Sequence, residues 1–181
     1  MGERPLRNVD LKVVEAFGQE WARFTNADLD PMELQSMFDD YVAVFPWDEL
    51  PPDPIGFDAG CGSGRWAAFF APRVGHLHCV DASREALDIA RQVLRGYQNV
   101  SFHHEDLSSF GVGDGTCDFG YSLGVLHHVP DTAEALRSCI RKLRPGAPFL
   151  VYLYYDLEGA GFVRRFLHQL VTAVRIMVSR L

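Results

Sequence analysis

Short apolar segments alternate with amphipathic ones between residues 55 and 155, and this alternation restricts the fold more than any other feature. The apolar segments predict five strands, at Ile55–Ala59, His76–Val80, Val100–His104, Cys117–Ser122 and Phe149–Tyr155. Helical spacing is found between several of them, at Arg65–Phe70, Arg84–Leu94 and Thr132–Leu143. Alternating strands and helices form parallel sheets that helices cover on both sides. The sequence therefore predicts an α/β fold.

The chain divides into three parts, of which the alternating region is the middle one. Residues 1–50 form a helical lead-in with helices expected at 9–25 and 31–44. Four prolines within residues 45–54 exclude a helix or a central strand there, so a stiff connector is expected. Residues 51–158 form the core domain. Residues 159–181 predict an amphipathic helix, which could cover a sheet edge, serve as a lid, or form a homodimer seam over 162–181.

The charge balance argues against a stable nucleic-acid partner. Lys and Arg number 17 and Asp and Glu number 24, so the formal net charge is −7. A nucleic-acid binder would need a basic surface to neutralise phosphates. The basic excess is confined to the last 49 residues, where it falls mainly on two predicted helices.

The cysteine and histidine patterns suggest neither a disulfide framework nor a metal site. The four cysteines, at 61, 79, 117 and 139, show no C-x-x-C spacing. His76 and His78 share one face of a predicted strand, but a third ligand with suitable spacing is missing. The N-terminus has no signal-peptide pattern, and no apolar run is long enough to span a membrane. We therefore expect a cytoplasmic protein with free thiols and no bound metal.

A glycine-rich loop joins the first predicted strand to its helix. Its sequence is Asp58-Ala59-Gly60-Cys61-Gly62-Ser63-Gly64. Such a turn lies at the carboxyl edge of a parallel sheet, where ligands bind. Alternate glycines let the backbone approach a ligand, and the helix that follows offers unpaired N–H groups. A dinucleotide-binding loop would have its third glycine at position 65, where this chain has Arg65. A tight structural turn is the alternative.

Further acidic and polar residues follow the next three strands. Asp81 ends the second strand and could accept both hydroxyls of a ribose. Asp106 follows the third strand and could accept an adenine amino proton, although a solvated turn acid is the alternative. The segment Ser122–Asp131 follows the fourth strand, beside the glycine-rich loop. Nicotinamide and adenosyl cofactors share the acid at position 81, so these positions together predict a ligand-binding edge without distinguishing the two.

In these motifs the sequence resembles the class I S-adenosylmethionine-dependent methyltransferases, especially the small-molecule branch that includes the ubiquinone/menaquinone-type enzymes. The resemblance covers about residues 55–155. It implies a Rossmann-like, doubly wound and mostly parallel sheet with the five visible strands in the order 3-2-1-4-5. It also implies that S-adenosylmethionine is bound by Asp58, Ala59, Gly60, Cys61, Gly62, Gly64, Asp81, Ala82, Asp106, Leu107, Ser122 and Leu123.

The function that the resemblance implies is methyl transfer to a small-molecule or glycan-type acceptor. His127 and His128 are candidate general bases, since a hydroxyl acceptor needs its proton removed. The alternative is that one of them packs, or caps the following helix. Family members add two more strands, which we do not expect in this sequence, so a fragment of a longer protein or a non-catalytic binding module is a second hypothesis. A nicotinamide-dependent oxidoreductase is a third, which Arg65 and Asp58 disfavour.

Overall fold

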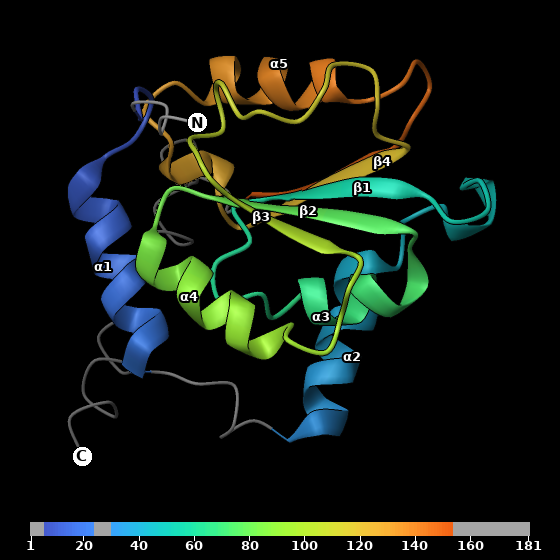
Figure 1. The fold of residues 1–181 in the computed structure, drawn as a ribbon, viewed down its shortest axis with the longest axis horizontal. Helices are drawn as coiled ribbons and strands as arrows, with labels where there is room; N and C mark the ends of the chain where they lie inside the picture. The colour runs from blue at the N-terminus through green and yellow to red at the C-terminus, as the bar shows by residue number, and fades with distance from the viewer. Residues whose placement is uncertain (1–5, 24–29, 154–181) are drawn as a thin grey trace, which may run out of the picture.

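A computed structural model describes residues 6–23 and 30–153, and in these residues five parallel strands form one sheet (Figure 1). The spatial order is β3-β2-β1-β4-β5, so the expected fold and strand order are confirmed. The strands are β1 (Ile55–Ala59), β2 (His76–Asp81), β3 (Val100–His104), β4 (Phe119–Leu123) and β5 (Phe149–Tyr152).

Three strands differ from their expected bounds, and the smallest difference is in β2, which ends at Asp81 instead of Val80. We expected the fourth strand to begin at Cys117, but β4 begins at Phe119. The N–H of Cys117 donates to Lys142 O at 2.9 Å, so its backbone pairs with the end of a helix and not with β1. The fifth strand ends at Tyr152 instead of Tyr155; residues 154 and 155 lie outside the described part of the chain.

The helices are α1 (Leu11–Arg23), α2 (Pro31–Val42), α3 (Ala67–Phe70), α4 (Arg84–Val93) and α5 (Thr132–Lys142). Side-chain caps explain where three of them begin. Asp30, Ser83 and Asp131 accept hydrogen bonds from N–H groups in the first turns of α2, α4 and α5. Two expectations were wrong in detail. The helix expected from Arg65 begins at Ala67, and the proline-rich connector contains a single 3₁₀ turn at Trp47–Glu49.

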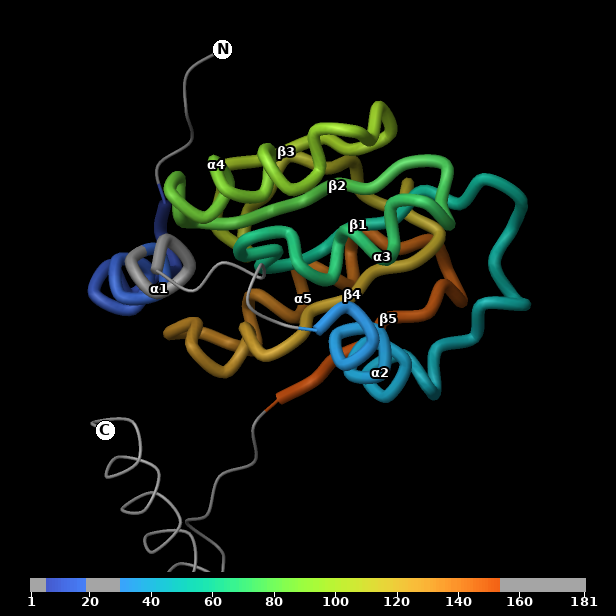
Figure 2. Tube along the Cα trace, turned by 90° about the horizontal axis from the view of Figure 1, so that it is seen from below, coloured from blue at the N-terminus to red at the C-terminus, as the bar shows by residue number. Residues whose placement is uncertain are grey.

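The helices lie in two layers with the sheet between them. Figure 1 shows α5 above the sheet and α2, α3 and α4 below it, while α1 stands beside the ends of the strands. Seen from below, α3 and α4 lie over the sheet, and α2 lies near β4 and β5 (Figure 2). Covering both faces explains why strands such as β4 are buried along nearly their whole length.

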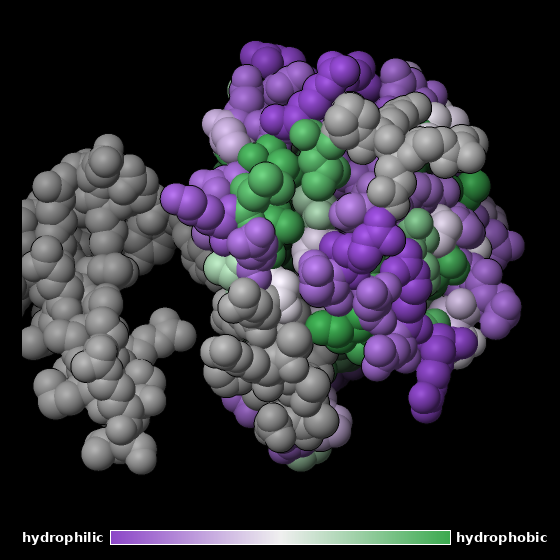
Figure 3. Space-filling view, turned by 60° about the vertical axis from the view of Figure 1, so that its left-hand side comes forward, coloured by the Kyte–Doolittle hydropathy of each residue, from purple (hydrophilic) through white to green (hydrophobic). Residues whose placement is uncertain are grey.

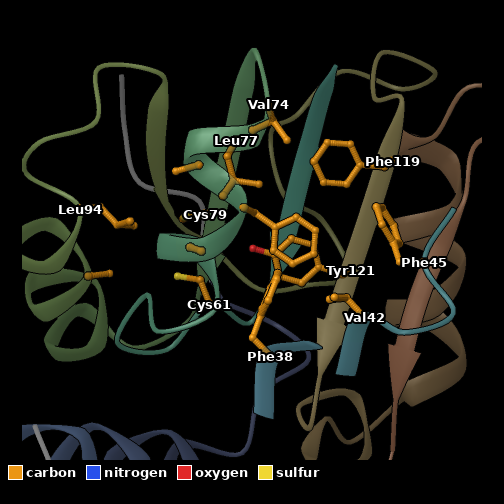
Figure 4. Close-up of a cluster of buried hydrophobic side chains, with 14 of the residues drawn as sticks. Phe38, Val42, Phe45, Cys61, Val74, Leu77, Cys79, Leu94, Phe119 and Tyr121 are labelled. Carbon is orange, nitrogen blue, oxygen red and sulfur yellow. The ribbon is translucent and has the colours of Figure 1, made fainter. Parts of the chain in front are cut away.

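Each face of the sheet has its own apolar core. The upper core joins Phe57 and Val80 of the sheet to Ala135 and Cys139 of α5. The lower core is rich in aromatic rings and joins α2 and α3 to the strands (Figure 4). In it, Phe70 stacks on Tyr121 with ring centroids 4.0 Å apart. Aromatic packing of this kind fixes the position of β4, on which part of the site depends.

No helix within residues 6–23 and 30–153 is both long enough and apolar enough to cross a membrane. The amphipathic helix expected at 159–181, and with it the dimer seam and the question of the two further strands, falls outside the described residues.

Candidate functional site

The glycine-rich loop folds back over the end of β2. The N–H groups of Gly60 and Cys61 both donate to Val80 O, at 2.8 and 3.0 Å. Gly60 has a φ of +87°, and a Cβ atom there would lie 2.4 Å from Val125 Cγ1. Only glycine satisfies both conditions, because other residues disfavour positive φ and would collide with Val125. The loop backbone is thus held directly against the segment that follows β4.

Asp81 links this loop to the start of α4 through its two carboxylate oxygens. Oδ2 accepts from Gly62 N and Oδ1 accepts from Ser83 N, each at 2.8 Å. Burial raises the pKa of Asp81, and these backbone hydrogen bonds oppose the increase. A carboxylate has about four acceptor positions, so the residue expected to bind the ribose keeps capacity for further donors. The sequence did not indicate this second task of building the loop.

Asp58 is a carboxylate buried beneath the loop, with 3% of its surface exposed. In the sheet it lies between Cys79 of β2 and Tyr121 of β4. Desolvation raises the pKa of Asp58 to about 8, although the nearby Tyr121 hydroxyl lowers it. Asp58 is therefore largely protonated at neutral pH in the absence of a positively charged partner.

The Tyr121 hydroxyl is a polar group that sequence reasoning missed. It is fully buried, and it has no hydrogen-bond partner of normal geometry among the described residues. In Figure 4 it points away from Val42 and Phe45, toward the side where Cys61 and Cys79 lie. Buried polar groups are seldom left unpaired. The Tyr121 hydroxyl lies near Asp58, so a polar or charged group bound beside them would have two possible hydrogen-bond partners.

Three further residues expected to bind the cofactor, Ser122, Leu123 and Cys61, lie in or beside this loop. Ser122 is fully buried, and its Oγ donates to Ala59 O at 2.8 Å, which ties the ends of the two strands together. Leu123 follows at the carboxyl end of β4. Cys61 is buried and its pKa is raised well above that of a free thiol, which argues against a nucleophile.

Asp106 lies in the loop after β3 and is buried, as is the adjacent Leu107. Its carboxylate accepts from Ser108 N at 2.8 Å and from Ser109 Oγ at 3.2 Å. It also accepts from Arg7 N, 99 residues earlier in the chain, at 3.2 Å. The expected alternative of a solvated turn acid is wrong, because this carboxylate is buried and hydrogen-bonded.

His127 and His128 occupy a 3₁₀ turn, Leu126–His128, immediately after β4. Their ring centroids lie 3.9 Å apart, and the His128 ring packs 5.0 Å from that of Phe17 in α1. Desolvation lowers the pKa of both histidines, so both are neutral at pH 7 and able to accept a proton. Neither caps α5, because Asp131 does so.

His76 and His78 are joined by a third histidine, which we did not expect. His103 Nε2 lies 3.1 Å from His78 Nδ1, and both ring atoms lie near Ser101 Oγ. Within the part of the chain that the structure describes, no group of three or more His, Cys, Asp or Glu residues could hold a metal ion. The cluster is therefore a polar network on β2 and β3.

Taken together, the glycine-rich loop, Asp58, Asp81, Asp106 and Ser122 meet at one edge of the sheet, where strands β1 to β4 end. This edge offers two buried carboxyl groups, Asp58 and Asp106, and the buried hydroxyl of Tyr121 beside Asp58. Such a donor and acceptor set fits a zwitterionic nucleoside with an ammonium group, which S-adenosylmethionine is. The face that includes this edge shows apolar patches among hydrophilic surface (Figure 3).

Comparison with known proteins identifies the family. The sequence profile of the methyltransferase domain matches residues 57–151. The chain is also 30% identical to the ubiquinone biosynthesis O-methyltransferase of Aromatoleum aromaticum, over 78% of this chain and 74% of that protein. This chain belongs to the S-adenosylmethionine-dependent methyltransferases. The resemblance stated from its motifs is confirmed, and the family's cofactor is S-adenosylmethionine, not a nicotinamide.

Solved structures agree with this assignment at the level of the methyltransferase fold. The YcgJ protein of Bacillus subtilis is 26% identical, with a TM-score of 0.59 over 70% of this chain and 52% of that one. The [4+2]-cyclase SpnF is 18% identical, with a TM-score of 0.64 over 81% of this chain and 61% of that one. The chain thus spans between about half and three quarters of these relatives. The likeness to a cyclase shows that this fold alone does not fix the reaction.

Proposed function

We propose that this methyltransferase binds S-adenosylmethionine at the carboxyl edge and transfers its methyl group to a small-molecule or glycan-type acceptor. The observation that carries the proposal is the convergence of the glycine-rich loop with Asp58, Asp81 and Asp106 at that edge. The net charge of −7 favours a small acceptor over a nucleic acid.

Each of these residues has a defined task toward the cofactor. Asp58 and neighbouring backbone carbonyls would hold the ammonium group, and N–H groups of the loop would hold the carboxylate. Asp81 and Ala82 would bind the ribose, while Asp106 and Leu107 would bind the adenine. Ala59, Cys61, Ser122 and Leu123 would line the space between. A charged ammonium beside Asp58 would favour its ionised form, since opposite charges lower a carboxyl pKa.

When bound, S-adenosylmethionine supplies a methyl group on a positively charged sulfur, which a nucleophile can take by in-line displacement. The chain's own contribution is then to orient the acceptor and exclude water. Correct orientation of two reactants can lower a barrier by roughly 7–11 kcal/mol. The burial of Asp58, Asp106 and Ser122 at this edge supports a dry, fixed site.

An acceptor hydroxyl would also need a base, and we propose His127 and His128, which lie in the turn after β4, for that role. Both are neutral at pH 7 because desolvation lowers their pKa. The relative from Aromatoleum aromaticum is named an O-methyltransferase, which favours a hydroxyl acceptor here.

A turnover assay with defined acceptors tests the proposal. The protein is incubated with S-adenosylmethionine and phenols, sugars or amines, and S-adenosylhomocysteine is quantified. We expect formation of S-adenosylhomocysteine that depends on a hydroxylated acceptor and falls at least tenfold in Asp81→Asn. A protein that binds cofactor but gives no acceptor-dependent product with any of these classes would favour a binding module instead.

A further inference from the structure

Asn8 is a buried polar residue that precedes α1, and the proposed roles leave it unexplained. Only 7% of its surface is exposed. A buried amide needs hydrogen-bond partners. Asn8 is not the cap of α1, because Asp10 Oδ1 accepts from Lys12 N and its carbonyl accepts from Val14 N.

The Asn8 side chain joins two loops that are far apart in the sequence. Its Nδ2 donates to Ser108 Oγ at 2.6 Å and to Asp131 O at 2.8 Å. Its Oδ1 accepts from Asp131 N at 2.7 Å. Both donor hydrogens are thus used, and the partners lie 100 and 123 residues along the chain.

Both loops belong to the site. Ser108 donates its N–H to the Asp106 carboxylate, the group assigned to the adenine. Asp131 caps α5 and follows the turn that contains His127 and His128. The preceding residue strengthens the link, because Arg7 N donates to the other Asp106 oxygen. The segment before α1 therefore contacts the adenine loop through backbone and side chain alike.

We propose that Asn8 is a positioning residue for cofactor binding: by joining the loop after β3 to the loop before α5, it fixes the adenine end of the site. The inference rests on the proposed cofactor role of Asp106. Asn8 acts through Ser108 and Asp131 and does not itself need to touch the cofactor. Without the Asn8 side chain, the loops after β3 and before α5 could move apart, and the residues that contact the adenine would no longer be held in place.

The test compares Asn8→Ala with Asn99→Ala, a matched control. Asn99 is likewise an asparagine whose Nδ2 makes two hydrogen bonds; it is partly buried and donates to the backbone carbonyls of Ala71 and Val74, both at 2.8 Å. It immediately precedes β3, at the amino ends of the strands and away from the site. Calorimetric titration measures the Kd of S-adenosylhomocysteine and of 5′-methylthioadenosine, which lacks the amino-acid end.

We expect Asn8→Ala to weaken the binding of both ligands by a similar factor of about ten, since the three hydrogen bonds of the Asn8 side chain are lost. Asn99→Ala should lose comparable thermal stability yet keep both Kd values within about twofold. Wild-type affinity in a folded Asn8→Ala protein, or equal weakening in Asn99→Ala, would overturn the inference.

Asn8→Asp provides a second test should Asn8→Ala fail to fold. It keeps the acceptor for Asp131 N but replaces the donor to Asp131 O with a carboxylate oxygen, so we again expect weaker binding of both ligands. Unchanged affinity in this variant would equally contradict the role. A wild-type protein that binds neither ligand would instead overturn the proposed function, and this inference with it.

Discussion

At the residue scale, the burial of Asp58 has a cost to stability. An ordinary Asp has a pKa of 3.8, and burial raises that of Asp58 to about 8 in the folded chain. Between these two pH values the folded state holds a proton that the unfolded state has lost. The free energy of unfolding therefore falls as pH rises through this window.

Replacing Asp58 with Asn should remove this dependence. We expect Asp58→Asn to gain stability relative to the wild type by up to about 1.4 kcal/mol for each pH unit between pH 5 and pH 8. Urea unfolding at several pH values measures it. The same variant should bind S-adenosylhomocysteine more weakly but retain its affinity for 5′-methylthioadenosine. Parallel stability curves for both proteins would show that Asp58 ionises normally.

His78 should produce the opposite trend at lower pH. Its pKa is lowered to about 4 by desolvation and by the neighbouring His76 and His103. The unfolded chain therefore binds a proton below about pH 6.5 that the folded chain resists, so stability falls as pH drops toward 4. We expect His78→Gln to unfold less readily than the wild type below pH 6, with the effect reduced by partial solvent exposure. An unchanged acid midpoint in thermal unfolding would contradict this.

At the scale of elements, the glycine-rich loop illustrates how much local sequence can predict. Its place between β1 and α3 followed from the apolar segment before it and the helix signal after it. The contact of Gly60 with Val125 did not, because the two are 65 positions apart and only the strand order brings them together.

Gly60→Ala tests whether this close approach matters. We expect a loss of roughly 2 kcal/mol or more in stability and at least tenfold weaker cofactor binding, because the residue needs positive φ and the added methyl meets Val125. Gly146→Ala is the matched control: Gly146 has a φ of +85° but nothing within 4 Å of an added Cβ. Gly146→Ala should therefore lose only the stability that positive φ costs a residue other than glycine. Equal losses in the two variants would exclude a contribution from Val125.

The turn after β4 yields a prediction about the two histidines. If one acts as general base, its replacement by Gln should lower kcat by about a hundredfold with little change in cofactor Kd. The alternative role is packing, for which His128 has a contact with the Phe17 ring; replacing a residue that only packs should lower thermal stability while kcat changes a few-fold. Steady-state kinetics of His127→Gln and His128→Gln distinguish the two roles. Normal kcat in both variants would mean that the acceptor needs no histidine base.

The structure also shows which element features escape the sequence. Apolar segments located all five strands, but the start of β4 depended on whether Cys117 pairs with β1 or with the end of α5. Asn8 and Tyr121 had no signal of their own, since a single polar residue in a lead-in or a strand becomes informative only when its distant partners are known. Contacts across 100 residues are set by the fold as a whole.

At the scale of the whole molecule, segments distant in the sequence assemble one edge of the sheet. Four strands contribute their carboxyl ends, and α1 and the residues before it stand over the same end (Figure 1). Helix α1 lies against the turn after β4 and against the start of α4. The Phe17 ring packs against that of His128, and a Cβ atom on Gly18 would lie 3.0 Å from Ser83 Oγ. The lead-in is therefore part of the site's construction.

The central claim is that this edge binds S-adenosylmethionine. A crystal structure of the chain grown with S-adenosylhomocysteine tests it most directly. We predict electron density over the carboxyl ends of β1, β2 and β4, with the ribose at Asp81, the adenine beside Asp106 and the ammonium near Asp58. Ligand density elsewhere on the molecule, or a site that stays empty at millimolar ligand, would contradict the account.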